Sequence, residues 1–239
     1  MSTQEQKTLK GYNFLIFFTM LYMSIMICSA ILTNRYIRLN DNFFILGGTL
    51  ISPLIFILGD IVAEIFGYKM ARQMIVCGFI CQAIFALICE SVVHSPYPEF
   101  FKSNNIYVFV FDQLLYIVIS SFIAFIISGL INIHIITRWK VLLRGRYFWL
   151  RSLGSSTIAE ALYSAIAILM MEAGSIELKN VWKIILASYL IKVLYSIFFA
   201  LPGNIIVNYI KNITNIDIYD YPADYNPFKR TENKKIEPA

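Results

Sequence analysis

Long apolar stretches dominate this sequence, and they restrict the folds that are open to it. A helix needs roughly 20 apolar residues to cross the hydrocarbon core of a bilayer. Six stretches reach or exceed that length: residues 12–34, 42–66, 73–93, 108–136, 152–171 and 181–209. The sequence therefore predicts an all-α polytopic membrane protein with six transmembrane helices in one bundle.

The composition excludes an ordinary soluble protein of this length. Of the 239 residues, 58% are hydrophobic and only 15% are charged, whereas about 25% of a typical soluble domain is charged. A soluble chain of 239 residues could not build a core large enough to bury such stretches. We expect a cytoplasmic N-terminal segment (1–11), a transmembrane domain (12–209) and a polar, disordered cytoplasmic tail (210–239).

Basic residues are distributed unequally between the two sides of the predicted spans. If both termini lie in the cytoplasm, fourteen of the twenty Lys and Arg residues lie on that side, as the positive-inside rule favours. The loop sequence RWKVLLRGRYFWLR mixes basic and aromatic residues. In a short loop this mixture predicts a membrane-interface anchor, with Trp139, Tyr147 and Trp149 at headgroup depth, rather than nucleic-acid binding.

No pattern in the sequence predicts a metal site, a disulfide or a cofactor. All four cysteines lie in apolar stretches, and Cys77 and Cys81 have the spacing of one helix face rather than of a C-x-x-C motif. The two histidines, His94 and His134, fall where apolar stretches end. We expect the cysteines to pack as small apolar side chains.

Three charged residues fall near the middle of predicted spans. At 1.5 Å per residue, Asp60 and Glu160 lie about 12 and 13 Å from the cytoplasmic ends of their spans, and Lys192 lies about 15 Å from an external end. A charge at that depth costs about 2.5–3.5 kcal/mol unless it is paired or faces a pathway. We therefore expect the three side chains to line one cavity. The alternative is that Lys192 merely neutralises one carboxylate, although Glu64 adds a further acid.

The second stretch also contains residues that interrupt helices. Gly47, Gly48, Ser52 and Pro53 occur together, and a proline inside a helix removes a hydrogen-bond donor and clashes with the preceding turn. We expect this span to be kinked or broken at Pro53. Broken helices near the midplane bind solutes in transporters, while an ordinary proline kink is the alternative.

Polar side chains recur on one face of the last two spans. Spacings of three and four residues align Thr157, Glu160 and Ser164, and similarly Tyr189, Lys192 and Ser196. Such a face is costly to expose to lipid. We expect both faces to point into the bundle.

Several segments resemble one family of membrane transporters. SPLIF, GDIVAEIFGYKMAR, RSLGSST and YLIKVLYSIFFALP, with Ser29 and Asn34, are similar to the queuosine-precursor transporter family, also called the vitamin uptake transporter family. Its most specific segment, D-x-x-x-E-x-x-G-x-x-x-A-R, is here formed by Asp60, Glu64, Gly67, Ala71 and Arg72. The resemblance extends over residues 12–209. It implies a carrier in the bacterial inner membrane that imports 7-deazaguanine precursors of the tRNA nucleoside queuosine.

A 7-deazaguanine would suit the polar residues of these spans. Its adjacent N1–H and 2-amino donors match a carboxylate, which Glu160 or Asp60 can supply. Lys192 or Asn34 can donate to the ring carbonyl, and aromatic side chains can stack on the flat rings. The predicted substrate-binding residues are Asn34, Phe56, Asp60, Glu64, Phe111, Thr157, Glu160, Tyr163, Tyr189 and Lys192.

Other classes of function make different predictions. A membrane-embedded enzyme is not expected, because the sequence contains neither H-E-x-x-H nor G-x-S-x-G. A substrate-binding membrane subunit energised by a separate ATPase stays open, since the chain has no Walker motif of its own. Copurification of an ATPase would distinguish that class from a standalone transporter. Proton coupling and assembly into a homo-oligomer also stay open.

Overall fold

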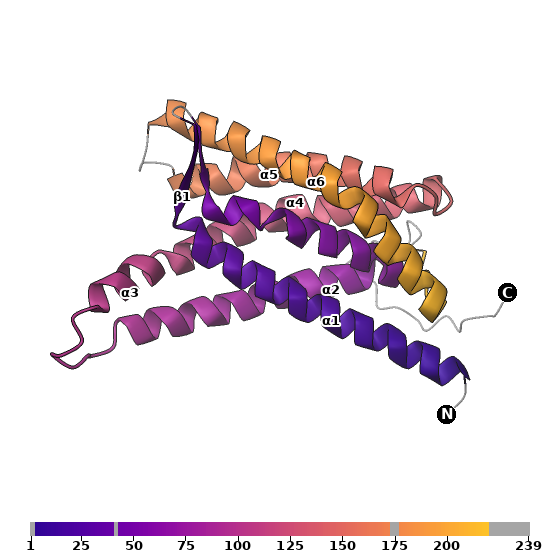
Figure 1. The fold of residues 1–239 in the computed structure, drawn as a ribbon, viewed down its shortest axis with the longest axis horizontal. Coiled ribbons are helices and arrows are strands. Elements are labelled where there is room, and N and C mark those ends of the chain that lie inside the picture. Colours follow the sequence, from indigo (N-terminus) through magenta and orange to yellow (C-terminus); the bar gives the residue numbers. More distant parts are fainter. Residues whose placement is uncertain (1–2, 41–42, 173–176, 220–239) are drawn as a thin grey trace.

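The computed structural model describes residues 3–40, 43–172 and 177–219, whose helices form one elongated bundle (Figure 1). The α-helices are α1 (Thr3–Thr33), α2 (Pro53–Val93), α3 (Asn104–Phe111), α4 (Leu114–Leu142), α5 (Phe148–Glu172) and α6 (Leu178–Thr214). Five helical stretches among the described residues are long and apolar enough to cross a membrane: Glu5–Thr33, Gly47–Val93, Asn104–Leu142, Phe148–Glu172 and Leu178–Thr214. The protein therefore has an all-α polytopic membrane fold.

The bundle places apolar side chains outside and many polar side chains inside. On α6, Leu186, Leu190 and Leu194 are 52%, 52% and 64% exposed. By contrast, Asp60 of α2 and Arg151 of α5 are both fully buried. This distribution is the reverse of a soluble protein, in which charged side chains are almost never fully buried unless paired. It fits a bundle whose outer surface is covered by lipid and whose interior holds the polar groups.

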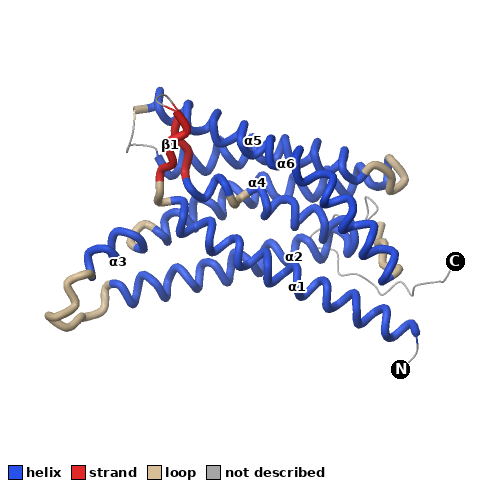
Figure 2. Tube along the Cα trace, viewed as in Figure 1, coloured by secondary structure: helices blue, strands red, loops and turns tan. Residues whose placement is uncertain are grey.

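A short β-hairpin, which the sequence analysis did not predict, connects α1 to α2 (Figure 2, red). Its strands β1 (Tyr36–Asn40) and β2 (Phe43–Leu46) are antiparallel, with Tyr36 opposite Leu46 and Ile37 opposite Ile45. The prediction that a helix begins at residue 42 is wrong for this segment. Aromatic and β-branched side chains pair across the two strands and favour the extended conformation. We call this end of the bundle the hairpin end.

The interruption expected at Pro53 lies at a junction between two helices. The 3₁₀ helix η1 (Gly47–Leu50) follows β2, and α2 begins at Pro53. Proline suits the first position of a helix because the N–H that it lacks would have no helical partner there. Pro53 therefore starts a helix instead of bending one.

A second break, which the sequence analysis did not predict, divides α2 at Gly67. This residue has φ 83° and ψ 170°, a conformation that is essentially restricted to glycine. Residues 53–66 run away from the hairpin end, and residues 68–93 run back toward it (Figure 1). The break thus turns one 41-residue helix into two antiparallel parts.

The opposite end of the bundle, which we call the termini end, holds the start of α1 and the end of α6 (Figure 1). Residues 3–11 of the predicted N-terminal segment belong to α1, and residues 210–214 of the predicted disordered tail continue α6. Residues 215–219 also pack against the bundle, where Ile216 joins the apolar core. The remainder of the predicted tail, residues 220–239, lies outside the described residues.

Candidate functional site

Asp60 lies in the first part of α2 and has no exposed surface. Its Oδ1 accepts a hydrogen bond of 2.5 Å from Asn132 Nδ2 of α4. Its Oδ2 accepts hydrogen bonds from Ser152 Oγ and, at 3.0 Å, from Ser156 Oγ, both on α5. The i,i+4 spacing of the two serines places them on one helix face. Three donors from two helices therefore satisfy this carboxylate.

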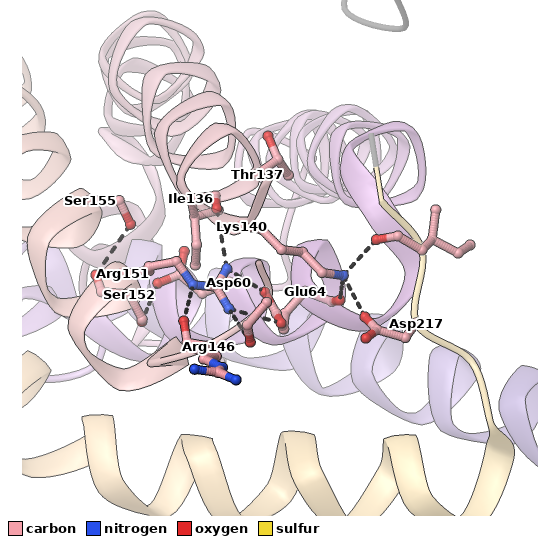
Figure 3. Close-up of polar contacts among 12 residues, drawn as sticks. Asp60, Glu64, Ile136, Thr137, Lys140, Arg146, Arg151, Ser152, Ser155 and Asp217 are labelled. Atoms are coloured by element: carbon pink, nitrogen blue, oxygen red, sulfur yellow. Dashed lines mark hydrogen bonds and ion pairs between the residues drawn. The ribbon is translucent and has the colours of Figure 1, made fainter. Parts of the chain in front are cut away.

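Glu64 lies one helical turn after Asp60 and binds two cations; Figure 3 shows its pairing with Arg151. Arg151 Nη1 and Nη2 lie 2.7 and 3.0 Å from the two carboxylate oxygens of Glu64, which is the bidentate geometry that an arginine favours. Lys211 Nζ of α6 lies 2.6 Å from Oε1 of the same carboxylate. Glu64 thus ties α2, α5 and α6 together at the termini end.

Residues 215–219, which we call the C-terminal strap, cover the helix break at Gly67. A break leaves the preceding carbonyl groups without helical N–H donors. Lys140 Nζ of α4 donates a 2.6 Å hydrogen bond to the Glu64 carbonyl oxygen, and the Ile218 N–H donates at 3.3 Å to the Ile65 carbonyl oxygen. Lys140 also contacts the strap itself. The strap and Lys140 therefore replace hydrogen bonds that the break removes.

Glu160 of α5 and Lys192 of α6 lie deeper in the bundle. Glu160 Oε1 accepts a 3.0 Å hydrogen bond from Ser196 Oγ, whereas its buried Oε2 has no hydrogen-bond partner among the described residues. Lys192 Nζ donates to Ser164 Oγ at 3.0 Å and lies 4.3 Å from the centre of the Tyr163 ring. Glu160 therefore keeps one acceptor oxygen available inside the bundle.

These polar groups form a row along the inner face of α5. Four side chains at every fourth position are at most 6% exposed: Ser152, Ser156, Glu160 and Ser164. The charge of Lys192 attracts the Glu160 carboxylate, whereas that of Asp60 repels it. Glu160 thus belongs to this row, and Asp60 binds two of its serines. Lys192 lines the first of the two cavities described next, whereas neither acid lines either of them, so these cavities do not bring the three charged side chains together as predicted.

Two small cavities of about 20 Å³ each lie beside Tyr163. The first is lined by Lys192 and by hydroxyl groups from three segments: Ser29, Thr33, Thr49 and Ser52. The second shares Ser29, Thr33 and Tyr163 with the first. A volume of this size holds about one water molecule, whereas sites for small molecules occupy roughly 300–1,000 Å³. A heterocycle therefore fits here only if the surrounding helices separate.

Aromatic side chains gather around Tyr163. The centre of its ring lies 5.8 Å from that of Phe56, so two of the predicted substrate-binding residues meet here. It also lies 6.0 Å from the ring centre of Phe125, which the sequence analysis did not select. The Lys192 ammonium over Tyr163 completes this cluster.

Four further predicted site residues belong neither to this aromatic cluster nor to the contacts of the three buried acids. Asn34 Nδ2 donates a 2.8 Å hydrogen bond to the Val110 carbonyl oxygen, and Phe111 packs against an apolar cluster that contains Leu114. Thr157 Oγ1 donates at 2.7 Å to the carbonyl oxygen four residues earlier in its own helix. Tyr189 is half-buried and lines neither cavity.

The side chains that bind the acids of α2 were not among the predicted site residues. Asn132 is an isolated amide inside a predicted span, which is the signal that could have identified it. Lys140 and Arg151 were assigned to the interface loop, yet their side chains are 2% and 0% exposed. The aromatic residues of that loop fit the expected anchor better, since Tyr147 and Trp149 are 59% and 38% exposed.

At the hairpin end, Tyr36 of β1 binds Glu172 near the end of α5. Its hydroxyl lies 2.8 and 2.7 Å from the two carboxylate oxygens. Burial, the hydrogen bond and the adjacent negative charge raise the pKa of Tyr36, so the hydroxyl stays protonated as the donor. In η1, Thr49 Oγ1 lies 3.3 Å from Ser188 Oγ of α6. These contacts fasten the hairpin and η1 beside the cavities.

Among the described residues, no group of three or more His, Cys, Asp and Glu side chains could hold a metal ion. The chemical groups of the site are a free carboxylate oxygen, an ammonium group, hydroxyl groups and aromatic faces. A few convergent polar groups among apolar and aromatic walls are typical of sites for small organic molecules.

Comparisons with known proteins place the chain in a family. No curated protein and no solved structure matches it. The sequence model of the vitamin uptake transporter family matches residues 46–207, a range that contains both broken parts of α2 and all of α4 and α5. This match covers more than half of the chain and includes Asp60, Glu64, Glu160 and Lys192. The protein belongs to the vitamin uptake transporter family.

Proposed function

We propose that this protein imports queuosine precursors for tRNA modification and that Glu160 recognises the substrate. The substrates would be 7-cyano- or 7-aminomethyl-7-deazaguanine, or queuine. Membership of the family supports membrane transport of a small molecule. The observation that carries the proposal is the buried Oε2 of Glu160, which lacks a hydrogen-bond partner among the described residues. An unsatisfied buried acceptor is costly, and the adjacent N1–H and 2-amino donors of a deazaguanine would satisfy it.

The other two buried acids are less suited to this role. Both oxygens of Asp60 already accept hydrogen bonds from Asn132 and the serines of α5. Both oxygens of Glu64 bind Arg151, and one also binds Lys211. A substrate would have to displace these donors. We therefore assign substrate recognition to Glu160 and a structural role to Asp60.

The groups around Glu160 fit the remainder of a deazaguanine. Lys192 Nζ can donate to the ring carbonyl, because its hydrogen bond among the described residues goes to the neutral hydroxyl of Ser164 and an ammonium carries three N–H donors. Tyr163 and Phe56 offer faces for stacking. Since the cavities here hold about 20 Å³ each, substrate entry requires α5 and α6 to move relative to α1, η1 and α2.

The proposed topology has six transmembrane spans with both termini in the cytoplasm of a bacterium. The break at Gly67 divides the long apolar stretch Gly47–Val93, so residues 47–66 and 68–93 are proposed as two spans. The termini end would face the cytoplasm, because Lys140, Arg151 and Lys211 gather there. In a variant without the native cysteines, a cysteine at Arg144 should react with an impermeant reagent only after cells are opened. Reaction of this cysteine in intact cells would show that the protein has the opposite orientation.

The function is tested by the queuosine content of tRNA. In a strain that cannot synthesise the precursors, deletion of this protein should abolish queuosine formation from low concentrations of an added precursor. Reintroduction of the gene should restore it. Purified protein in liposomes should transport the same radiolabelled precursor without ATP or a partner. Dependence on a copurifying ATPase would instead identify a substrate-binding subunit.

A further inference from the structure

A larger cleft lies at the termini end, away from Glu160. Its volume is about 480 Å³, within the range of sites for small molecules. It is lined by Glu64 of α2, the α4–α5 loop and start of α5 (Gly145, Arg146, Tyr147, Phe148 and Trp149), and α6 (Asn204, Val207, Asn208 and Lys211). Phe148 and Val207 are 4% and 1% exposed. The cleft thus combines an apolar floor with polar walls.

Two carboxamides on α6 face this cleft without being used by the fold. Asn204 and Asn208 both line it and are one helical turn apart. No hydrogen bond of either side chain occurs among the described residues. A carboxamide presents one acceptor and one donor side by side. That pair matches the carbonyl and N1–H edge of a guanine-type ring.

An ion pair links one lining residue of this cleft to the start of the polar row of α5. Glu64 lines the cleft, and its carboxylate binds Arg151 at 2.7 and 3.0 Å. The next residue after Arg151 is Ser152, which donates to Asp60. Arg151, Ser152, Glu64 and Asp60 lie close together (Figure 3). A rearrangement of the Glu64–Arg151 pair would therefore open a path from the cleft to Asp60 and, along the row, toward Glu160.

We propose that this cleft is a second substrate-binding site, facing the cytoplasm, in which Asn204 and Asn208 bind the amide edge of the transported heterocycle during release. The inference rests on the proposed import of a 7-deazaguanine. Beyond that function, we assign a second binding site, its two recognition residues and an ion pair between this site and Glu160. Tyr147 and Trp149, at the rim of the cleft, supply aromatic surface for the flat ring.

A phospholipid headgroup is the competing occupant, because the cleft lies near the expected membrane interface. Arg146 and Lys211 would attract an anionic headgroup. However, Glu64 brings a carboxylate into the same wall, and Lys211 is already bound to Glu64 at 2.6 Å and to Asp217 at 2.9 Å. The two carboxamides add no charge. This balance favours a neutral heterocycle.

The test measures transport from each face of the membrane separately. Right-side-out and inside-out vesicles containing wild-type protein or the double variant Asn204→Ala/Asn208→Ala are supplied with radiolabelled 7-cyano-7-deazaguanine. The variant should raise KM on the order of tenfold from the cytoplasmic face, because two hydrogen bonds are lost. KM from the external face should change less than about twofold by the same reasoning. Asn212→Ala, an exposed position one turn further along α6, is the matched control.

Each other outcome has a distinct meaning. If the wild-type protein transports the compound and the double variant has an unchanged KM in both vesicle orientations, the second site is overturned and the proposed function stays intact. A defect that depends only on the anionic lipid content of the vesicles assigns the cleft to a lipid and overturns the inference. Failure of wild-type vesicles to transport the compound overturns the proposed function, and this inference with it.

Discussion

Arg151 binds both carboxylate oxygens of Glu64, at 2.7 and 3.0 Å, although the two side chains are 0% and 1% exposed. The two residues are 87 positions apart in the sequence. They join the first part of α2 to the start of α5 at the point where α2 breaks. A buried pair of this kind is costly to disrupt, because removing one partner strands the other charge.

Glu64→Gln should therefore destabilise the protein severely. The substitution leaves the buried Arg151 without its counter-charge and Lys211 with Asp217 alone, and breaking a buried ion pair costs about 3–5 kcal/mol. Thermal unfolding in detergent, with expression level, is the measurement. Glu90→Gln is the control on the same helix, because Glu90 is half-buried and forms no side-chain ion pair among the described residues. Equal unfolding temperatures for both variants would show that the pair contributes little.

Gly67→Ala should destabilise the protein by about 1–3 kcal/mol, because a side chain is strained at φ 83°. Gly59→Ala is the matched control, because Gly59 lies in the regular helical part of α2. A Cβ at Gly59 meets nothing within 4 Å, and alanine favours a helix interior by about 0.8–1 kcal/mol. Unfolding in detergent should therefore shift in opposite directions for the two variants. A neutral Gly67→Ala would mean that the break does not require glycine.

Asp60→Asn should lower stability more than it lowers substrate affinity. The substitution removes the charge and one of the two acceptor oxygens, so the donors on one side of the group lose their acceptor, at an expected cost of about 1–3 kcal/mol. Asp112→Asn is the control, because Asp112 is 53% exposed and its described partner is His94. Normal unfolding combined with loss of precursor uptake would instead make Asp60 a substrate ligand.

Hydrophobic length and polar periodicity predicted the membrane fold and the location of the buried charges. Each long apolar stretch needs a bilayer, and α5 repeats a polar side chain every fourth residue. The partners of those charges could not be predicted. Arg151 belongs to a loop sequence that also carries exposed basic residues, and only the fold shows that this one arginine turns inward to Glu64.

The hairpin and the break at Gly67 also escaped prediction, for a different reason. The strands are only five and four residues long and continue directly into an apolar stretch, so hydropathy alone favours a helix there. Gly67 is one of several glycines in apolar segments. Tertiary contacts stabilise the break at this glycine, because Lys140 and Ile218 supply the hydrogen bonds that the helix loses.

The most direct test of the account is precursor uptake by Glu160→Gln, measured together with thermal unfolding of the purified variant. Glutamine preserves the volume but offers one acceptor oxygen, so it cannot accept both adjacent donors of a deazaguanine. Ser196 can still donate to that oxygen. We predict uptake affinity reduced about tenfold to a hundredfold, with unfolding close to that of wild type. Unchanged uptake, or uptake lost only together with stability, would contradict the assignment of Glu160 as the substrate ligand.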